Sequence, residues 1–159
     1  MGKDPIISVL FVEGKIDVSK RSLLPNIGSG GECIFVGRTR PDHHEKHGKL
    51  IALHYDCYKK MAQSQLEKLA EEAVARFDVR VIQICHSCGK VPIDGASVVS
   101  AVGSKHRDDA FLACRFLLDL LKLPARIWKQ EVWADGTTGS NSNTTTAVMV
   151  PGKIKNHKT

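Results

Sequence analysis

The sequence lacks any apolar run approaching the roughly 18 residues that a membrane-spanning helix needs. Its first residues, Met1-Gly2-Lys3-Asp4, include an acid and no long apolar stretch of the kind found in signal peptides. Aromatic residues make up only 6% of the chain, and no cluster of them is interleaved with basic residues to stack on bases. We therefore expect a protein of the cytosol that neither spans a membrane nor binds nucleic acid.

The number and spacing of the cysteines argue against a disulfide framework and against a zinc site. The five cysteines are odd in number and mostly stand singly inside apolar segments, so we expect reduced thiols and no disulfide framework. Cys85 and Cys88 have the pair spacing of a zinc knuckle or redox motif, but no second cysteine or histidine pair lies at a suitable distance. Nothing fixes a ligand geometry for His43, His44 and His47. The sequence predicts no metal site.

The chain is long enough to bury one core without staples. Its 159 residues are 42% hydrophobic and 25% charged, which is the usual balance of a folded protein. We assign the folded domain to residues 1–134 and expect residues 135–159 to form a disordered tail, because that segment is low in complexity and has no periodicity. The net charge of +6 points to an anionic partner.

Hydrophobic spacing predicts an α+β fold. Short apolar or β-branched runs predict strands at 6–12, 32–36, 50–55, 79–85, 96–102 and 125–133. Apolar residues at three- and four-residue intervals predict amphipathic helices at 58–76 and 104–122. The polar segment 39–49 suggests a hairpin with a mobile loop. Together these elements predict a mixed or antiparallel sheet packed with two main helices, similar to an α/β hammerhead.

Basic residues gather where predicted elements end. Arg38 and Arg40 follow a strand, and His106 and Arg107 stand at the start of a helix. Free N–H groups and the dipole at a helix N-terminus favour an anion, so phosphate is a natural ligand there. A solvated helix start explains the same residues equally well.

Two lysines surround Pro124. Lys122 lies near a helix end and Lys129 on a strand, and partial burial of either amine would lower its pKa and suit acid–base or nucleophilic work. The simpler interpretation is that Lys122 caps its helix and that Lys129 extends its amine to solvent. Spacing alone leaves both open.

Three segments of the sequence carry a resemblance when they are taken together. They are Phe35-Val36-Gly37-Arg38-Thr39-Arg40, Ser104-Lys105-His106-Arg107, and Leu120-Leu121-Lys122 with Pro124 and Ile127-Trp128-Lys129-Gln130-Glu131. The chain resembles the large, catalytic subunit of the molybdopterin synthase family from about Gly30 to Glu131. It departs from the family pattern at Leu53-His54-Tyr55 and at His86-Ser87-Cys88.

The resemblance implies a sulfurtransferase of molybdenum cofactor biosynthesis. Such an enzyme converts cyclic pyranopterin monophosphate to molybdopterin by adding two sulfurs. Each sulfur arrives as the C-terminal Gly-Gly thiocarboxylate of a small ubiquitin-like subunit. The resemblance also implies a homodimer of large subunits within a heterotetramer, and no metal or redox cofactor.

The same resemblance implies the site residues. Lys122 and Lys129 look like the catalytic amines, and Phe35 and Leu118 like pocket-lining residues. The substrate-contacting set comprises Arg38, Thr39, Arg40, His106, Arg107, Lys122, Lys129, Gln130 and Glu131. Arg107 and Lys122 would be roughly 22 Å apart on one helix, so a small substrate that touches both requires a pocket shared between two subunits.

Two other functions stay open at this point. A noncatalytic RNA- or anion-binding domain would use the positive charge. A sulfurtransferase with a persulfide on Cys85 or Cys88 would carry sulfur on the chain itself.

Overall fold

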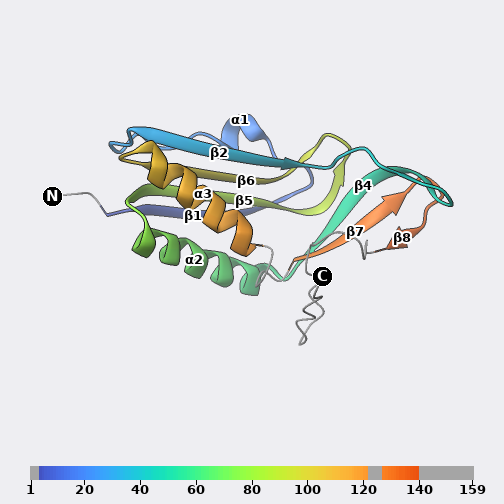
Figure 1. Cartoon of the computed structure of the whole chain (residues 1–159). Helices are drawn as coiled ribbons and strands as arrows, with labels where there is room; N and C mark the ends of the chain where they lie inside the picture. Colours follow the sequence, from blue (N-terminus) through green and yellow to red (C-terminus); the bar gives the residue numbers. More distant parts are fainter. Residues whose placement is uncertain (1–3, 122–126, 140–159) are drawn as a thin grey trace, which may run out of the picture.

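The computed structural model describes residues 4–121 and 127–139, and within them the chain forms an α+β fold (Figure 1). The strands are β1 (Ile6–Glu13), β2 (Gly31–Arg38), β3 (His43–His44), β4 (Gly48–Cys57), β5 (Val79–Pro92), β6 (Ala96–Ser104), β7 (Ile127–Trp133) and β8 (Thr138–Gly139). The helices are α1 (Val18–Arg21), α2 (Lys59–Arg76) and α3 (Arg107–Leu121). The predicted fold class and both main helices are confirmed. None of the helices in these ranges has the length and apolar character to cross a membrane.

The long strand β5 takes part in two sheets. Its first part pairs in parallel with β1 and antiparallel with β6, which also pairs with β2; we call this the main sheet. Its last part, Gly89–Pro92, pairs with β4, which continues to β7 and β8; we call this the small sheet. Gly89 has φ +85°, a conformation that glycine adopts without steric cost, and it stands where β5 changes partners. Figure 1 shows the small sheet extending from one end of the main sheet.

Both faces of the main sheet are covered. Helices α2 and α3 each turn an apolar stripe toward one face, so that Leu66, Ile84 and Leu117 join a single buried cluster. Fully burying a side chain of this size stabilises a fold by about 1.5–3 kcal/mol. On the other face, Ile16 and Val99 form a smaller cluster that α1 helps to cover. The two layers fix the direction in which α3 runs over β2 and β6.

The predicted hairpin between residues 32–36 and 50–55 is wrong. Strand β2 pairs with β6, whereas β4 pairs with β5 and β7. Each strand finds its apolar partner far away in the sequence, so adjacency along the chain does not decide the pairing. The polar segment between them instead contains β3, with His43 opposite Lys49.

Several predicted boundaries also need correction. Strand β5 continues seven residues past its predicted end at Cys85, because pairing with β4 carries it through the turn-like Gly89. Helix α1 and strand β8 were not predicted. Strand β8 pairs with β7, so the expected disordered tail does not begin at residue 135. The rest of that predicted tail, from residue 140, lies outside the described residues.

One pair of cysteines contradicts the expected reduced thiols. Cys57 and Cys88 form a disulfide with a Cα–Cα distance of 5.7 Å, because the approach of β4 to β5 brings together residues that are 31 positions apart. Cys33, Cys85 and Cys114 are free.

Candidate functional site

The segment 38–40 is held firmly where β2 ends. Nη1 of Arg38 donates to the carbonyl oxygen of Asp94 at 2.9 Å. Thr39 is fully buried, and its Oγ1 donates to the carbonyl oxygen of Val91 at 3.3 Å. The backbone of Thr39 also bonds to Asp94 and Gly95 in the turn before β6. The threonine therefore anchors a segment whose two neighbours, both arginines, are exposed.

The second group of predicted site residues lies on β7. Lys129 is half-buried and stands opposite Tyr55 of β4. Glu131 is almost fully buried, opposite Leu53, whereas Gln130 is exposed. Alternation along the strand puts Lys129 and Glu131 on one face and Gln130 on the other.

One row of residues joins the two groups. Thr39 bonds to Val91, Val91 stands opposite Leu53, and Leu53 stands opposite Glu131. Neighbouring strands are about 4.8 Å apart, so Val91 and Glu131 are separated by roughly 10 Å across the small sheet. The structure thus brings the arginine segment and the β7 residues to one region of the molecule.

His106 and Arg107 lie at the other end of the main sheet. Arg107 begins α3 directly beside Gly31, the first residue of β2, and both His106 and Arg107 are exposed. The length of β2 sets Gly31 about 23 Å from Arg38. Within one chain, His106 and Arg107 are therefore remote from the other group. Lys122 lies outside the described residues; it follows Leu121, at the opposite end of α3 from Arg107.

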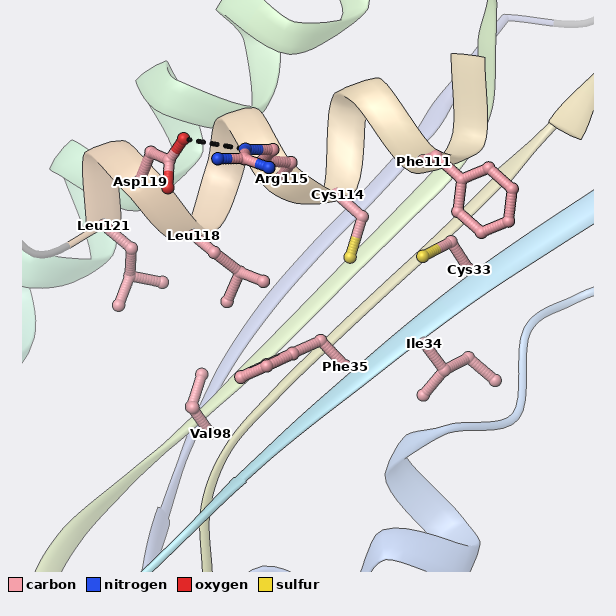
Figure 2. Close-up of a pocket in the computed structure, with 10 residues that line it drawn as sticks. All are labelled: Cys33, Ile34, Phe35, Val98, Phe111, Cys114, Arg115, Leu118, Asp119 and Leu121. Atoms are coloured by element: carbon pink, nitrogen blue, oxygen red, sulfur yellow. Dashed lines mark ion pairs between the residues drawn. The ribbon is translucent and has the colours of Figure 1, made fainter. Parts of the chain in front are cut away.

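Phe35 and Leu118, expected to line a pocket, line an apolar groove between β2 and α3 (Figure 2). The groove has a volume of about 430 Å³. Phe35 is 43% exposed and Phe111 is 59% exposed, so large apolar surfaces face outward there. Strand β2 pairs with β6 and lies at the end of the strand order, which leaves its outer backbone edge without a strand among the described residues. An apolar groove beside an open edge is typical of a surface that another chain covers.

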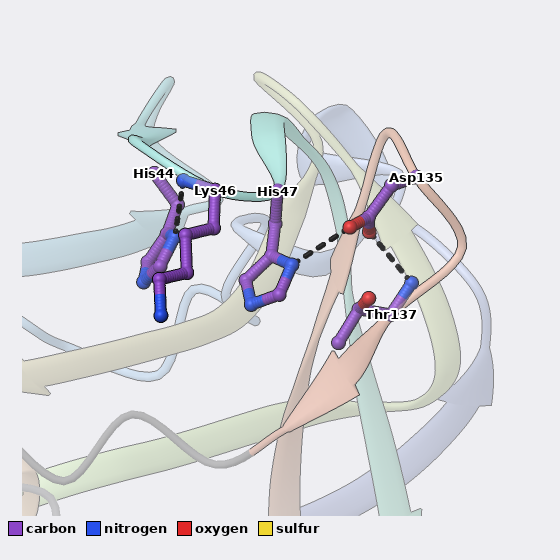
Figure 3. Close-up of polar contacts among 5 residues, drawn as sticks. All are labelled: His44, Lys46, His47, Asp135 and Thr137. Atoms are coloured by element: carbon purple, nitrogen blue, oxygen red, sulfur yellow. Dashed lines mark hydrogen bonds and ion pairs between the residues drawn. The ribbon is translucent and has the colours of Figure 1, made fainter.

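The polar loop around β3 forms a small network of its own (Figure 3). His44 stacks on His47 with ring centroids 4.5 Å apart. Nδ1 of His47 lies 2.7 Å from Oδ2 of Asp135. The backbone N–H of Thr137 and the hydrogen bond with His47 lower the pKa of Asp135 to about 2. The contact of His47 with Asp135 ties the loop to the β7–β8 turn. No group of three or more side chains that could hold a metal ion occurs in the described ranges.

The two buried free thiols, Cys85 and Cys114, offer little nucleophilic sulfur. Burial raises the pKa of Cys85, and burial together with the neighbouring Cys33 raises that of Cys114 to about 12. A persulfide route would require a thiolate on Cys85 or Cys88, but Cys85 is buried and Cys88 is bonded to Cys57.

A contact between the buried ring of His86 and the partly buried ring of Tyr55, beside the small sheet, was not singled out from the sequence. His86 is 6% exposed, and the ring of Tyr55 meets it edge-on at 5.2 Å. Burial lowers the pKa of His86 to about 4, so the imidazole is neutral at pH 7. Both residues appeared in the sequence only as departures from a family pattern, and nothing local signals that two strands would bring them together.

Comparison with known proteins gives a consistent family match. The family model described as MoaE protein matches residues 11–123. A molybdopterin synthase catalytic subunit from Drosophila grimshawi is 35% identical over 133 residues, which is 82% of this chain and 36% of that protein. The chain thus spans little more than a third of the length of this relative.

Solved structures agree with this match. Molybdopterin synthase from Staphylococcus aureus superimposes with a TM-score of 0.73 at 28% identity, covering 82% of this chain and 96% of that one. A complex of subunits 1 and 2 of molybdopterin-converting factor from Helicobacter pylori gives a TM-score of 0.68, covering 88% of this chain and 94% of that one. Its identity of 20% makes this a likeness of fold.

Proposed function

The chain belongs to the MoaE protein family, and from this membership we propose that it is the catalytic subunit of a molybdopterin synthase in molybdenum cofactor biosynthesis. In the proposed reaction, two sulfurs pass from thiocarboxylates of a small ubiquitin-like subunit to cyclic pyranopterin monophosphate. The observation that supports the proposal is the row from Thr39 through Val91 and Leu53 to Glu131, which attaches the segment of the exposed Arg38 and Arg40 to the same small sheet that carries the half-buried Lys129 on β7.

These residue types suit sulfur transfer to a phosphorylated pterin. Arg38 and Arg40 would hold the phosphate, while Thr39 keeps the segment in position through its buried hydrogen bonds. In each transfer the thiocarboxylate sulfur would bond to a pterin carbon as an oxygen substituent leaves that carbon. Water attack on the acyl carbon would then break the acyl C–S bond, leaving sulfur on the pterin and a carboxylate on the small subunit. Cations stabilise the oxyanion formed in that attack, and the amines of Lys122 and Lys129 would transfer protons. This route uses no metal or redox cofactor.

The proposed partner is a small subunit with a C-terminal Gly-Gly thiocarboxylate. The fold likeness to a chain from a complex of subunits 1 and 2 of molybdopterin-converting factor supports such a partner. The negative thiocarboxylate would be drawn toward Lys122 beyond the end of α3. The cytosolic location expected from the sequence stays a prediction.

A second copy of the chain would complete the pocket. His106 and Arg107 lie at one end of α3, about 21 Å from Leu121 at the other. Two copies related by a two-fold axis through the middle of α3 would bring each Arg107 to the far end of the partner's helix. The middle residue of α3, Cys114, lines the apolar groove together with Phe111 and Leu118. The groove therefore lies where the two-fold contact would be needed.

The first test measures conversion of cyclic pyranopterin monophosphate to molybdopterin with a thiocarboxylated small subunit. Lys122→Ala and Lys129→Ala should each reduce turnover by about 10²–10⁴-fold, as expected for loss of a general acid or base. Lys68→Ala removes an exposed lysine of α2 and should retain wild-type turnover. No turnover by the wild type with a verified cognate partner would overturn the proposed function.

A second test examines the shared pocket. Arg107→Ala and Lys122→Ala chains would be mixed, and mixed dimers purified through two different tags. One of the two pockets in such a dimer retains both residues, so about half of the wild-type activity should return. Mixed dimers as inactive as either parent would argue against a pocket built from two chains.

A further inference from the structure

The Cys57–Cys88 disulfide stands at the junction of the two sheets. Cys57 is the last residue of β4, and Cys88 immediately precedes the part of β5 that pairs with β4. Cys88 itself is still in register with Glu13 of β1, in the main sheet. The disulfide therefore links the small sheet to the main sheet at the point where β5 passes from one to the other.

A short strand ladder also holds the junction at this point. The ladder between β4 and β5 comprises the pairs of Ala52–Tyr55 with Gly89–Pro92. Beyond Tyr55, β4 diverges from β5 and stays paired with β7, where Cys57 stands opposite Ile127. Among the described residues, the disulfide adds a covalent link to this short ladder, to the contact of Cys57 Sγ with the carbonyl oxygen of Ser87 and to the edge-on contact of the Tyr55 and His86 rings.

The disulfide is also close to the candidate site. Tyr55 lies two residues before Cys57 and stands opposite both Gly89 and Lys129. A change in how β4 leaves β5 would thus shift Lys129 relative to the arginine segment, which is attached to β5 through Thr39. Displacements of this kind weaken the alignment on which catalysis depends.

The two sulfurs differ in access. Cys88 is 4% exposed, whereas Cys57 is partly exposed, so an exchanging thiol would reach Cys57 first. Among the free cysteines, Cys85 and Cys114 are buried and have raised pKa values, which disfavours their thiolates. The third free cysteine, Cys33, is partly exposed but stands on β2, outside the junction of the two sheets. The position of the disulfide therefore singles out the Cys57–Cys88 pair.

We propose that Cys57 and Cys88 form a thiol–disulfide exchange site whose oxidised state clamps the two sheets and aligns the candidate site. This inference rests on the proposed function for its effect on activity. The oxidant would be a low-molecular-weight disulfide such as glutathione disulfide. The Cys57 thiolate attacks one of its sulfurs and releases one glutathione thiolate. The Cys88 thiolate then attacks the Cys57 sulfur and releases the second. Two protons leave the protein, and its two electrons reduce glutathione disulfide to two thiols.

The test compares the full-length protein equilibrated in glutathione disulfide with the same protein in reduced glutathione. Non-reducing peptide mapping should find the peptides of Cys57 and Cys88 linked in the first sample and separate in the second. Amide hydrogen exchange of residues 52–57 should slow on oxidation, because the clamp restricts opening of the ladder. The KM for the pterin should rise roughly tenfold on reduction, as misalignment weakens binding.

Matched variants separate this site from other thiols. Cys57→Ser and Cys88→Ser should abolish the redox response in exchange and KM, whereas Cys33→Ser, which changes a partly exposed free thiol, should retain it. Absence of the linked peptide after oxidation would overturn the proposal, as would equal exchange rates in both states. If the protein has no synthase activity in either state, the proposed function fails, and the exchange data still decide whether the clamp exists.

Discussion

Reducing the Cys57–Cys88 disulfide should lower the free energy of unfolding of the whole chain by a measurable amount. The two cysteines are 31 residues apart. In the chain-entropy treatment, opening a loop of this length returns entropy to the unfolded chain worth about 3.7 kcal/mol at 25 °C. For a chain of this size, such a change corresponds to a fall in Tm of roughly 7–15 °C.

Urea unfolding followed by circular dichroism, with and without a phosphine reductant, measures this difference. Cys57→Ser and Cys88→Ser each lack the bond, so each variant should unfold at the same urea concentration in both buffers. Comparing every protein with itself removes the separate cost of placing serine at the buried position 88. If peptide mapping verifies reduction and the wild-type midpoint does not move, the disulfide is not a stabilising link between the sheets.

Three further predictions follow from burial and backbone geometry. The pKa of His86 is about 4 in the folded protein and 6.5 in the unfolded chain, so the unfolded chain takes up a proton first as the pH falls. The free energy of unfolding should therefore decrease by up to about 3 kcal/mol between pH 6.5 and pH 4. Urea titrations of wild type and His86→Gln across this range show whether the loss disappears in the variant. Gly89→Ala and Gly136→Ala should each destabilise by about 1–2 kcal/mol in thermal unfolding, because both glycines have positive φ. The methyl at 89 would also meet the end of the exposed Glu13 side chain, which can move aside, so the two losses should be similar; an unchanged Tm for Gly89→Ala would contradict the role of its backbone conformation at the junction. Phe111→Asp places a charge in the groove and should convert dimers to monomers in sedimentation velocity. Tyr58→Asp changes an equally exposed aromatic residue outside the groove and should leave the dimer intact. If Phe111→Asp stays dimeric, the groove is not the contact between the two copies.

The local spacing of apolar residues was sufficient to predict an element that buries a single face. Helix α2 was predicted at 58–76 and is observed at Lys59–Arg76, because its apolar spacing is also the spacing of the residues that pack on β5. The prediction ended strand β5 too early, at Cys85, because Gly89 and Pro92 are residues that usually stand in turns. Pairing with β4 outweighs that preference, and the glycine serves as the kink where the strand changes sheets. Such pairing depends on distant residues and has no local signal.

The resemblance named the residues of the candidate site but not their arrangement, and the role of each residue stays a prediction. The resemblance proposed Arg38, Thr39 and Arg40 as one substrate-contacting group, yet the structure uses the middle residue as a buried anchor and exposes the other two. The disulfide could not be read from an odd cysteine count, since it depends on where β4 leaves β5. The expected separation of Arg107 from Lys122 stays a prediction, because Lys122 lies outside the described residues; Arg107 and Leu121 stand at the two ends of α3.

Strand β5 also makes the register of the two sheets interdependent. Its residues 81–88 fix the alignment of β1, and its residues 89–92 fix that of β4 and, through β4, of β7. Side chains alternate faces along a strand, so inserting one residue between His86 and Gly89 would invert one sheet relative to the other. Lys129 would then point to the opposite face while every residue of the site was still present. Homologous chains can therefore vary freely in the loops around this strand, but length changes within it would separate the two halves of the site.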